Sequence, residues 1–150
     1  MPLKLDIPAG LRGEVTLTVD PSHTAAQVGS GKIRVLATPV LINLFEAAAL
    51  KACEHLLPEG HQSLGTRLDI SHVAATPVGM KVIARAEVTG VEGRTVQFRL
   101  EAHDERDLIG EGRHERVVVS VARFDERVRE KVAAVAAVAN ATGGTQCKAS

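Results

Sequence analysis

Apolar and polar residues alternate along five stretches of the chain, and alternation with a period of two predicts a strand that buries one face. The first stretch is short and covers residues 14–20, where Val15, Leu17 and Val19 share one side. The other four come later, at residues 63–73, 80–88, 94–103 and 108–124. Turn residues such as the Glu92–Gly93 pair separate them, so they predict an antiparallel meander of long strands.

Three of the long strands predict rows of side chains that face the protein core. These rows are Leu64, Thr66, Leu68, Ile70 and His72; Met80, Val82, Ala84, Ala86 and Val88; and Val96, Phe98, Leu100 and Ala102. His72 is the one ionisable side chain among them, so it is expected on the interior side of the sheet. The other five histidines, His114 among them, fall in loops or on polar phases.

A long apolar segment over residues 40–57 predicts a helix that is buried on most of its sides. Thr38 can cap its N-terminus, Pro39 suits the first helical position, and the segment 58–60 ends it with proline and glycine. Such a helix needs a large partner, and a curved sheet can wrap around it. The pattern therefore predicts an α+β fold of about five antiparallel strands around one long helix, with a sheet edge that favours a dimer.

The C-terminal part of the chain predicts a second, shorter helix at residues 126–139, which Asp125 can cap. Residues 141–150 have the composition of a flexible tail. A chain of 150 residues can bury about 70% of its unfolded surface around a single core. We therefore expect one domain, over residues 1–140.

Composition and charge exclude several classes of protein. Eighteen basic residues balance eighteen acidic ones without a long block of either sign, so binding to nucleic acid or to an anionic membrane is not expected. With three Phe and neither Trp nor Tyr, almost no side chain can stack on a base. The two cysteines, Cys53 and Cys147, are too few for a zinc site, and no apolar run could span a bilayer. We expect a cytoplasmic protein with reduced thiols and no metal.

Glu46 is the most informative polar residue, because three of its four neighbours at helical spacing are apolar. Burying a carboxylate there is costly unless a partner compensates its charge or it stays protonated, and carboxylates with perturbed pKa values often mark functional sites. The alternative is that Glu46 lies with Asn43 and Glu54 on a partly hydrated stripe of the helix.

His72 and Thr38 each allow a catalytic and a structural interpretation. An imidazole has a pKa near neutrality and could serve as a base, but a core histidine can also simply hydrogen-bond to the backbone. A threonine before a proline at a helix start is what capping selects. The same helix N-terminus offers unpaired N–H groups and a partial positive charge, which suit a developing oxyanion.

Two local motifs and the spacing of three polar residues carry a resemblance to a known family. The motifs are Val-Leu-Ala-Thr-Pro-Val at residues 35–40 and Ser-Leu-Gly-Thr-Arg-Leu-Asp-Ile-Ser-His-Val-Ala-Ala-Thr-Pro-Val-Gly at residues 63–79. Glu46 follows Thr38 by eight residues, and His72 follows Glu46 by twenty-six. Over residues 13–123 the chain thus resembles the hot-dog-fold thioesterases, most closely the branch typified by fluoroacetyl-CoA thioesterase.

The resemblance implies a hot-dog fold and the hydrolysis of a small acyl-CoA thioester. It implies a catalytic set of Thr38, Glu46 and His72 at the interface of a homodimer or a higher oligomer. Gly65 corresponds to a functional glycine near the thioester carbonyl, and Arg116 to a basic residue near the active site. Coenzyme A is then part of the substrate, and no separate cofactor is expected.

These assignments lead to a mechanistic hypothesis. His72, coupled to Glu46, activates either Thr38 or a water molecule, and a backbone N–H of Gly65 or of the helix start receives the carbonyl oxygen. The thiolate leaves readily, because a free thiol has a pKa near about 8.5.

One region departs from the family pattern, and two other functions stay open. The fluoroacetate-specialised enzyme has lid phenylalanines in the loop before the helix, where this chain has Gly29 and Lys32. This difference favours another small acyl group. A hydratase or dehydratase on the same fold would need an Asp and His pair, but Asp69 and His72 point to opposite faces of one strand. A non-catalytic dimer that binds or senses acyl-CoA is the other alternative.

Overall fold

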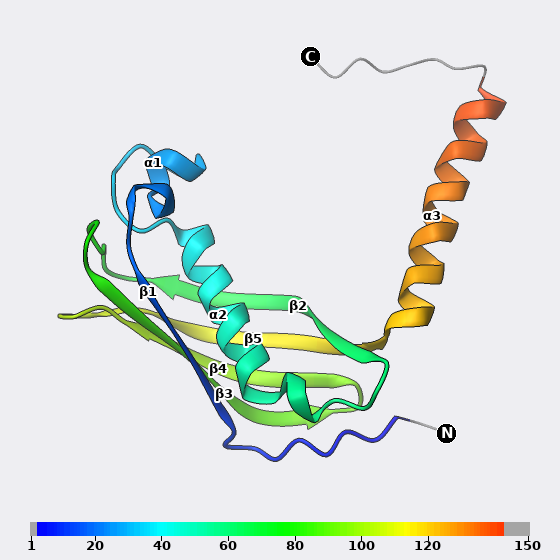
Figure 1. Ribbon diagram of the computed structural model, residues 1–150, viewed down its shortest axis with the longest axis horizontal. Coiled ribbons are helices and arrows are strands. Elements are labelled where there is room, and N and C mark those ends of the chain that lie inside the picture. The colour runs from blue at the N-terminus through cyan, green and yellow to red at the C-terminus, as the bar shows by residue number, and fades with distance from the viewer. Residues whose placement is uncertain (1–2, 143–150) are drawn as a thin grey trace.

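The computed structural model describes residues 3–142. Its main element is a curved, five-stranded antiparallel sheet. Its strands are β1 (Arg12–Thr18), β2 (His61–His72), β3 (Lys81–Glu92), β4 (Thr95–His103) and β5 (Leu108–Ser120). They lie in the order β1-β3-β4-β5-β2, and the sheet curls around helix α2 (Thr38–Cys53), as Figure 1 shows. The predicted α+β fold, with about five strands wrapped around one long helix, is confirmed.

The predicted meander holds for β3, β4 and β5 but is wrong for β2. Although β2 precedes β3 in the chain, it pairs with β5, from His61 opposite Ser120 to His72 opposite Gly110. The connection from β2 to β3 therefore crosses from one side of the sheet toward the other. As a result β2 is an edge strand, and one side of its backbone is not paired within the described residues.

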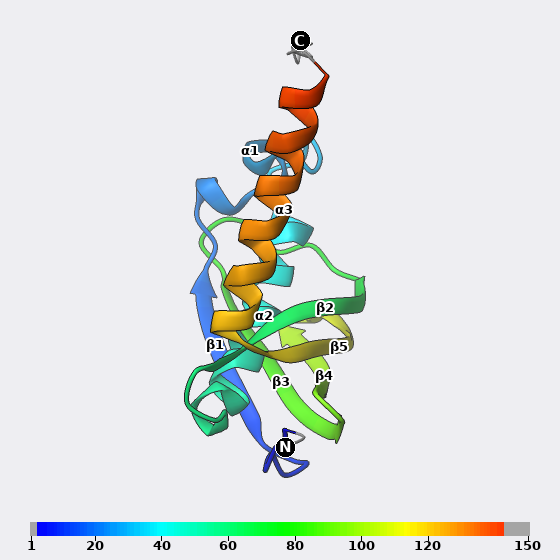
Figure 2. The same ribbon diagram turned by 90° about the vertical axis from the view of Figure 1, so that its right-hand side faces the viewer.

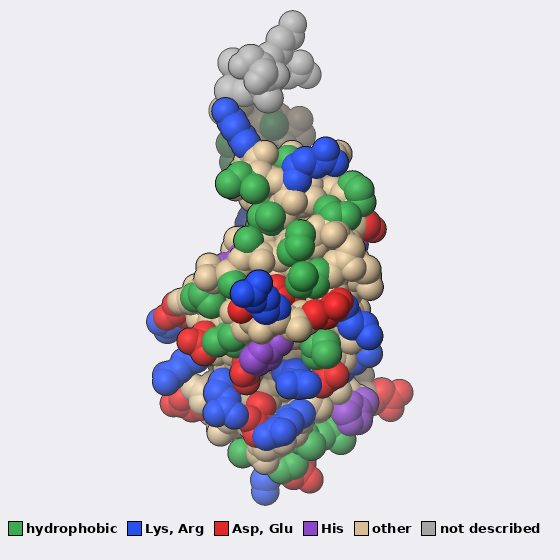
Figure 3. All heavy atoms as spheres, turned by 90° about the vertical axis from the view of Figure 1, so that its left-hand side faces the viewer, with side chains coloured by type: hydrophobic (Ala, Val, Ile, Leu, Met, Phe, Trp, Pro, Cys, Tyr) green, Lys and Arg blue, Asp and Glu red, His purple; other side chains and the backbone are tan. Residues whose placement is uncertain are grey.

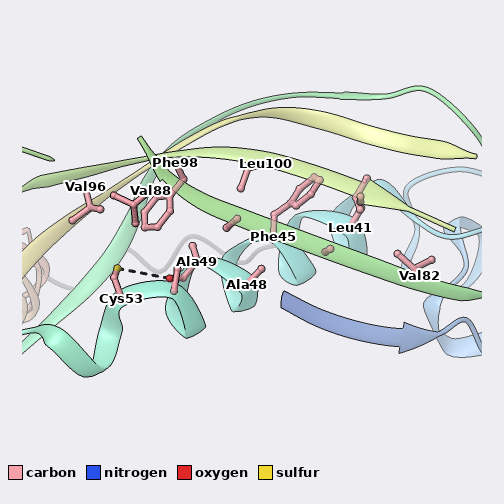
Figure 4. Packing of buried hydrophobic residues seen from close by; sticks show 14 of the residues in the cluster. Leu41, Phe45, Ala48, Ala49, Cys53, Val82, Val88, Val96, Phe98 and Leu100 are labelled. Carbon is pink, nitrogen blue, oxygen red and sulfur yellow. Dashed lines mark hydrogen bonds between the residues drawn. The ribbon is translucent and has the colours of Figure 1, made fainter. Parts of the chain in front are cut away.

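Helix α2 packs one apolar face into the concave side of the sheet. The buried residues on this face are Leu41, Phe45, Ala48, Ala49, Ala52 and Cys53. They meet the inward rows of β3 and β4, drawn in Figure 4. Those rows are confirmed by the burial of Val82, Ala84, Ala86, Val88, Val96, Phe98, Leu100 and Ala102. The alternation of apolar residues in these two strands thus reports the position of the core correctly.

The predicted inward row of β2 is only partly right, because a bulge interrupts the strand. The register of β2 against β5 shifts between Gly65 and Arg67. One extra residue in a strand reverses the face toward which the following side chains point. Before the shift Ser63 is buried and Leu64 is 38% exposed, whereas after it Leu68 packs against the core as predicted. The bulge therefore turns a different set of residues toward α2.

Helix α2 starts at Thr38, one residue earlier than the predicted first helical residue Pro39, so Thr38 is not its N-cap. The cap position is Ala37, which offers no side-chain oxygen, while Thr38 and Pro39 are the first helical residues. The helix ends at Cys53 and continues as the 3₁₀ turn η2 (Glu54–Leu56). Because Thr38 has moved inside the helix, its hydroxyl is available to a partner other than the helix backbone.

Two short helical elements that the pattern did not predict join β1 to α2. They are η1 (Pro21–His23) and α1 (Ala25–Val28), and Gly29 ends α1 with a φ of 85° that favours glycine. The N–H of Ala37 donates a hydrogen bond of 2.9 Å to the carbonyl oxygen of His23. The loop before α2 is thereby fastened to the start of the helix.

Helix α3 (Val121–Ala141) projects away from the sheet, beyond the edge formed by β2 (Figures 1 and 2). The predicted start at residue 126 and the predicted cap Asp125 are wrong. Strand β5 ends at Ser120, whose hydroxyl accepts a hydrogen bond from the N–H of Arg123 and so caps the helix. The run of valines before Ser120 continues the alternation typical of a strand, so the sequence pattern did not indicate where β5 ends and α3 begins. None of the residues of α3 is buried.

Residues 143–150 lie outside the described part of the chain, and with them Cys147 and nearly all of the predicted tail at residues 141–150. Among residues 3–142, no helix combines the length and the hydropathy that crossing a membrane requires.

Candidate active site

Thr38 and His72 form one hydrogen-bonded pair, although 34 residues separate them in the sequence. Thr38 is the first residue of α2, and His72 is the last residue of β2. Oγ1 of Thr38 lies 2.8 Å from Nδ1 of His72. A hydroxyl at this distance from an imidazole has the geometry of a nucleophile and its base. The N-terminus of α2 adds a partial positive charge where a carbonyl oxygen would become negative.

The His72 ring is half-buried, and its second nitrogen is shielded from solvent. Nε2 is buried and has no hydrogen-bond partner among the described residues. Burial lowers the pKa of His72 from its usual value of 6.5, because the charged ring is poorly hydrated there. A neutral ring that carries its hydrogen on Nε2 leaves Nδ1 able to accept the proton of Thr38.

The lowered pKa of His72 predicts how the activity depends on pH. We expect the decline of kcat/KM for an acyl-CoA toward low pH to have its midpoint below pH 6.5, because a base acts in its neutral form and the pKa of His72 is lowered. The absorbance of the thioester bond measures the rate over this range without a thiol reagent. A decline centred above pH 6.5 would contradict the prediction, provided that circular dichroism shows an intact fold at each pH.

Glu46 contacts Arg116 rather than His72. Its Oε2 accepts a hydrogen bond of 2.9 Å from Nη1 of Arg116, which lies on β5, 70 residues away in the sequence. Only 5% of the Arg116 side chain is exposed, against 36% of the Glu46 side chain. A buried ion pair needs good geometry and additional hydrogen bonds to offset the lost hydration. Arg116 is therefore the group that compensates the carboxylate on the apolar side of α2.

Ser63 and Glu54 hold Arg116 in place, and neither was predicted from the sequence to belong to the site. Nε of Arg116 donates to Oγ of Ser63 at 2.8 Å, and Nη2 donates to the carbonyl oxygen of Ser63 at 3.0 Å. Glu54 in turn accepts hydrogen bonds from the N–H and the hydroxyl of Ser63, at 2.9 and 2.6 Å. Because Ser63 reaches the inner face only through the bulge, the alternation of β2 gave no indication of its role.

His114 is a second buried histidine at this site, and the prediction that it lies on a polar phase is wrong. Its Nδ1 lies 2.8 Å from the carbonyl oxygen of Arg67, and its Nε2 lies 3.3 Å from Nη1 of Arg116. Burial lowers the pKa of His114, so the ring is neutral next to the guanidinium. The strand phase that His114 shares with buried Val118 could have revealed it.

Gly65 lies directly against the carboxylate of Glu46. A Cβ atom at this position would come within 2.5 Å of Oε2 of Glu46 and 3.2 Å of the His114 ring. Any larger residue would therefore displace the carboxylate from Arg116. The site needs glycine here because of this close approach.

The five predicted site residues form two separate groups within one chain. Thr38 and His72 lie at the start of α2, whereas Glu46, Gly65 and Arg116 lie farther along the helix. Eight residues of helix correspond to about 12 Å. The predicted direct coupling of Glu46 to His72 is therefore wrong within a single chain, since each of these residues has another partner.

A groove of about 370 Å³ opens beside the Thr38–His72 pair. Its apolar walls include Val35, Leu36 and Ala74, together with Ile33 and Val73, which are 71% and 59% exposed. Figure 3 views the molecule from the end that carries α1 and shows hydrophobic side chains gathered on its upper part. Such a groove, ending at a hydroxyl and an imidazole, can accommodate a short acyl chain.

The described residues hold neither a metal-binding cluster nor an activated thiol. No group of three or more His, Cys, Asp or Glu side chains among residues 3–142 could hold a metal ion. Burial raises the pKa of the Cys53 thiol to about 11, so it stays protonated and unreactive at neutral pH.

Comparison with known proteins identifies the family. A family model described as fluoroacetyl-CoA-specific thioesterase matches residues 19–122, which contain all five predicted site residues. The chain belongs to the fluoroacetyl-CoA-specific thioesterase family. It is a thioester hydrolase with the predicted hot-dog fold. Membership in this family favours hydrolysis over the hydratase, dehydratase and non-catalytic alternatives.

Several members and relatives of this thioesterase family are similar over most of their length. The fluoroacetyl-CoA thioesterase of Streptantibioticus cattleyicolor is 43% identical over 100 residues, which cover 67% of this chain and 72% of the relative. A solved structure of the fluoroacetyl-CoA thioesterase FlK has a TM-score of 0.77 at 36% identity, covering 83% of this chain and 96% of that one. A thioesterase superfamily member from Thermus thermophilus has a TM-score of 0.78 at 32% identity, covering 85% and 97%.

Proposed function

We propose that this thioesterase hydrolyses a small acyl-CoA other than fluoroacetyl-CoA, with Thr38 and His72 as its reacting groups. The hydrogen bond of 2.8 Å between them, beside an apolar groove, carries the proposal. Among the similar structures, a variant of FlK was solved in complex with acetyl-CoA. Gly29 and Lys32 stand in the loop where the fluoroacetate-specialised enzyme is expected to carry lid phenylalanines. The groove therefore has no aromatic lid from this loop that would select a fluorinated acyl group.

The reaction follows from the positions of the hydroxyl and the imidazole. Nδ1 of His72 takes a proton from Thr38 or from a water molecule, and the resulting oxygen nucleophile attacks the carbonyl carbon. The carbon–sulfur bond then breaks, and His72 returns the proton to the thiolate of CoA. If Thr38 is the nucleophile, a water molecule attacks the acyl-threonine in a second round and releases the acid. Detection of this acyl-enzyme by mass spectrometry distinguishes the covalent route from direct attack by water.

In this proposal a second copy of the chain completes the active site. A 12-residue edge strand such as β2 readily pairs with another strand, and two identical strands related by a twofold axis pair antiparallel. This pairing brings the His72 end of one β2 toward the His61 end of the other. The Glu46–Arg116 pair and the backbone of Gly65 in one copy then approach the Thr38–His72 pair of its partner. Glu46 can orient the reacting water or the imidazole there, and the Gly65 N–H can donate to the carbonyl oxygen.

Mixed dimers test whether two chains share the site. We expect Thr38→Ala and Glu46→Gln to be nearly inactive alone, and a mixture refolded from denaturant to regain up to about a quarter of the wild-type activity. The reason is that half of a random mixture is heterodimer, and each heterodimer has one site with both residues intact. Thr38→Ala mixed with Thr38→Ala/Glu46→Gln is the matched control, because no combination restores a site. Recovery no greater than in this control would contradict a shared site.

A substrate panel tests the choice of acyl group. Release of free thiol from acetyl-, propionyl-, phenylacetyl- and fluoroacetyl-CoA gives kcat/KM for each. We expect a non-fluorinated substrate to be preferred, and preference for fluoroacetyl-CoA would overturn this part of the proposal.

The proposal places the enzyme in the cytoplasm, in agreement with the free, buried thiol of Cys53.

A further inference from the structure

Helix α3 leaves the fold as an arm that no other part of the described chain covers. It has 21 residues, about 31 Å in length, and none of them is buried. The match to the family model ends at residue 122, the second residue of this helix. The family model therefore leaves nearly all of this helix unmatched, and the hydrolytic site described above does not account for it.

One side of α3 carries an apolar stripe. Its residues, which recur every third or fourth position, are Phe124, Val128, Val132, Val135 and Val138. Between 39% and 65% of each remains exposed. The charged residues Glu126, Arg129 and Glu130 occupy the opposite side, whereas Lys131 falls at a position within the stripe, beside Val135 and Val138. An amphipathic helix with this pattern is typical of one that packs its apolar side against another surface.

A matching apolar surface lies at the opposite end of β2. Ile33 and Val73 protrude there beside the groove, and Val28 and Val78 are each 43% exposed at the same end of the fold. We refer to these four residues as the α1-end patch. It lies too far from α3 to be covered by the same chain, because the 12 residues of β2 span about 40 Å.

Antiparallel pairing of two β2 strands removes this separation. The N–H of Val121 donates to the carbonyl oxygen of Gly60 at 3.0 Å, so α3 starts next to the beginning of β2. His72 and the α1-end patch lie at the other end of the same strand. In an antiparallel pair, the beginning of one β2 lies beside the end of the other. Figures 1 and 2 show that α3 points past the β2 edge, toward the space that the second copy would occupy.

We propose that α3 of one copy packs its apolar stripe on the α1-end patch of the partner and forms an outer wall of the partner's acyl groove. This inference rests on the dimer of the proposed function and adds to it the element that closes the groove. A strand edge alone contributes mostly main-chain contacts, whereas a stable interface needs about 800 Å² per copy. The apolar stripe from Phe124 to Val138 is about 21 Å long and can add apolar side-chain contacts to those of the strand edge.

Crosslinking tests the contact directly. In a Cys147→Ser background, which leaves the buried Cys53 as the only native thiol, Ile33→Cys is combined in turn with Phe124→Cys, Val128→Cys or Val132→Cys. We expect a short bis-maleimide to give a covalent dimer for at least one pair, and none for Ile33→Cys with Arg129→Cys or Ala133→Cys. A dimer from an α3 cysteine without Ile33→Cys would show that α3 pairs with α3. That result, or no dimer from any of the stripe pairs, overturns the proposal.

Pairs of glutamate substitutions, one pair on the apolar side of α3 and one on the opposite side, test whether α3 affects substrate binding in the groove. We expect Val128→Glu/Val135→Glu to raise KM at least threefold for the preferred acyl-CoA and to weaken dimerisation in light scattering. The matched control Ala133→Glu/Ala137→Glu puts the same charges on the other side of the helix and should leave both values unchanged. Equal effects of the two variants contradict the proposal.

The two experiments also separate this contact from the proposed function. If the cysteine pairs crosslink as expected but the wild-type protein hydrolyses no acyl-CoA, the proposed function fails while the contact stands. If the wild-type protein is an active thioesterase but no stripe pair crosslinks, the contact fails while the proposed function stands.

Discussion

Replacing His72 with alanine should lower kcat/KM for the preferred acyl-CoA by about 100- to 10,000-fold, the range that a general base contributes. The physical reason is that His72 is the group within hydrogen-bond distance of the Thr38 hydroxyl, at 2.8 Å. Thiol release from the preferred acyl-CoA, measured under first-order conditions, gives the ratio. Thermal unfolding of the variant should stay close to that of the wild type, because the hydrogen bond that the substitution removes joins the ring to the exposed hydroxyl of Thr38.

The exposed histidine His55, replaced by alanine, is the matched control for this experiment and should retain full activity. Added imidazole should restore part of the lost rate to the His72→Ala variant, since a small base can enter the vacated space. A variant that turns over at more than a tenth of the wild-type rate would show that His72 is not the base.

Replacing Arg116 with methionine should reduce the free energy of unfolding by about 1–3 kcal/mol, because the partly buried carboxylate of Glu46 and the carbonyl oxygen of Ser63 lose their hydrogen-bond donor. Methionine keeps much of the volume but removes the hydrogen bonds to Glu46 and Ser63 and leaves the carboxylate of Glu54 without this nearby charge. Urea unfolding followed by circular dichroism measures the difference.

The ion pair between Arg85 and Glu14, 2.7 Å long, provides the control for Arg116. Both of its side chains are half exposed, and such surface pairs contribute about 0–1 kcal/mol. We therefore expect Arg85→Met to change the free energy of unfolding by much less than Arg116→Met does. Equal losses for the two variants would mean that the buried network around Arg116 does not stabilise the fold.

The His72 and Arg116 variants probe the two halves of the site, which have different origins. The Thr38–His72 half depends on a threonine that is not needed as a helix cap, because Ala37 occupies that position. The Glu46–Arg116 half depends on a bulge that turns Ser63 and Gly65 inward. In both halves a small departure from ideal secondary structure sets the position of a polar group.

The pattern of apolar residues predicted the elements well where local spacing decides them. The inward rows of β3 and β4 and the central helix follow from the periods of two and 3.6 residues, which any chain with one buried face must obey. The local pattern predicted the start of α3 too late in the chain, because the valines before Ser120 continue the alternation of strand β5 up to the helix. It also failed at the bulge in β2, because one extra residue leaves no mark in the sequence.

The sequence by itself indicated that Glu46 needs either a compensating partner or a hydrated position and that His72 faces the interior, because both conclusions depend only on neighbouring residues. Family resemblance added Gly65 and Arg116 to the candidates Thr38, Glu46 and His72. Only the tertiary structure decided which of them meet: Thr38 with His72, and Glu46 with Arg116. Strand order fixes these contacts, and strand order results from the packing of the whole sheet around α2 rather than from any local spacing.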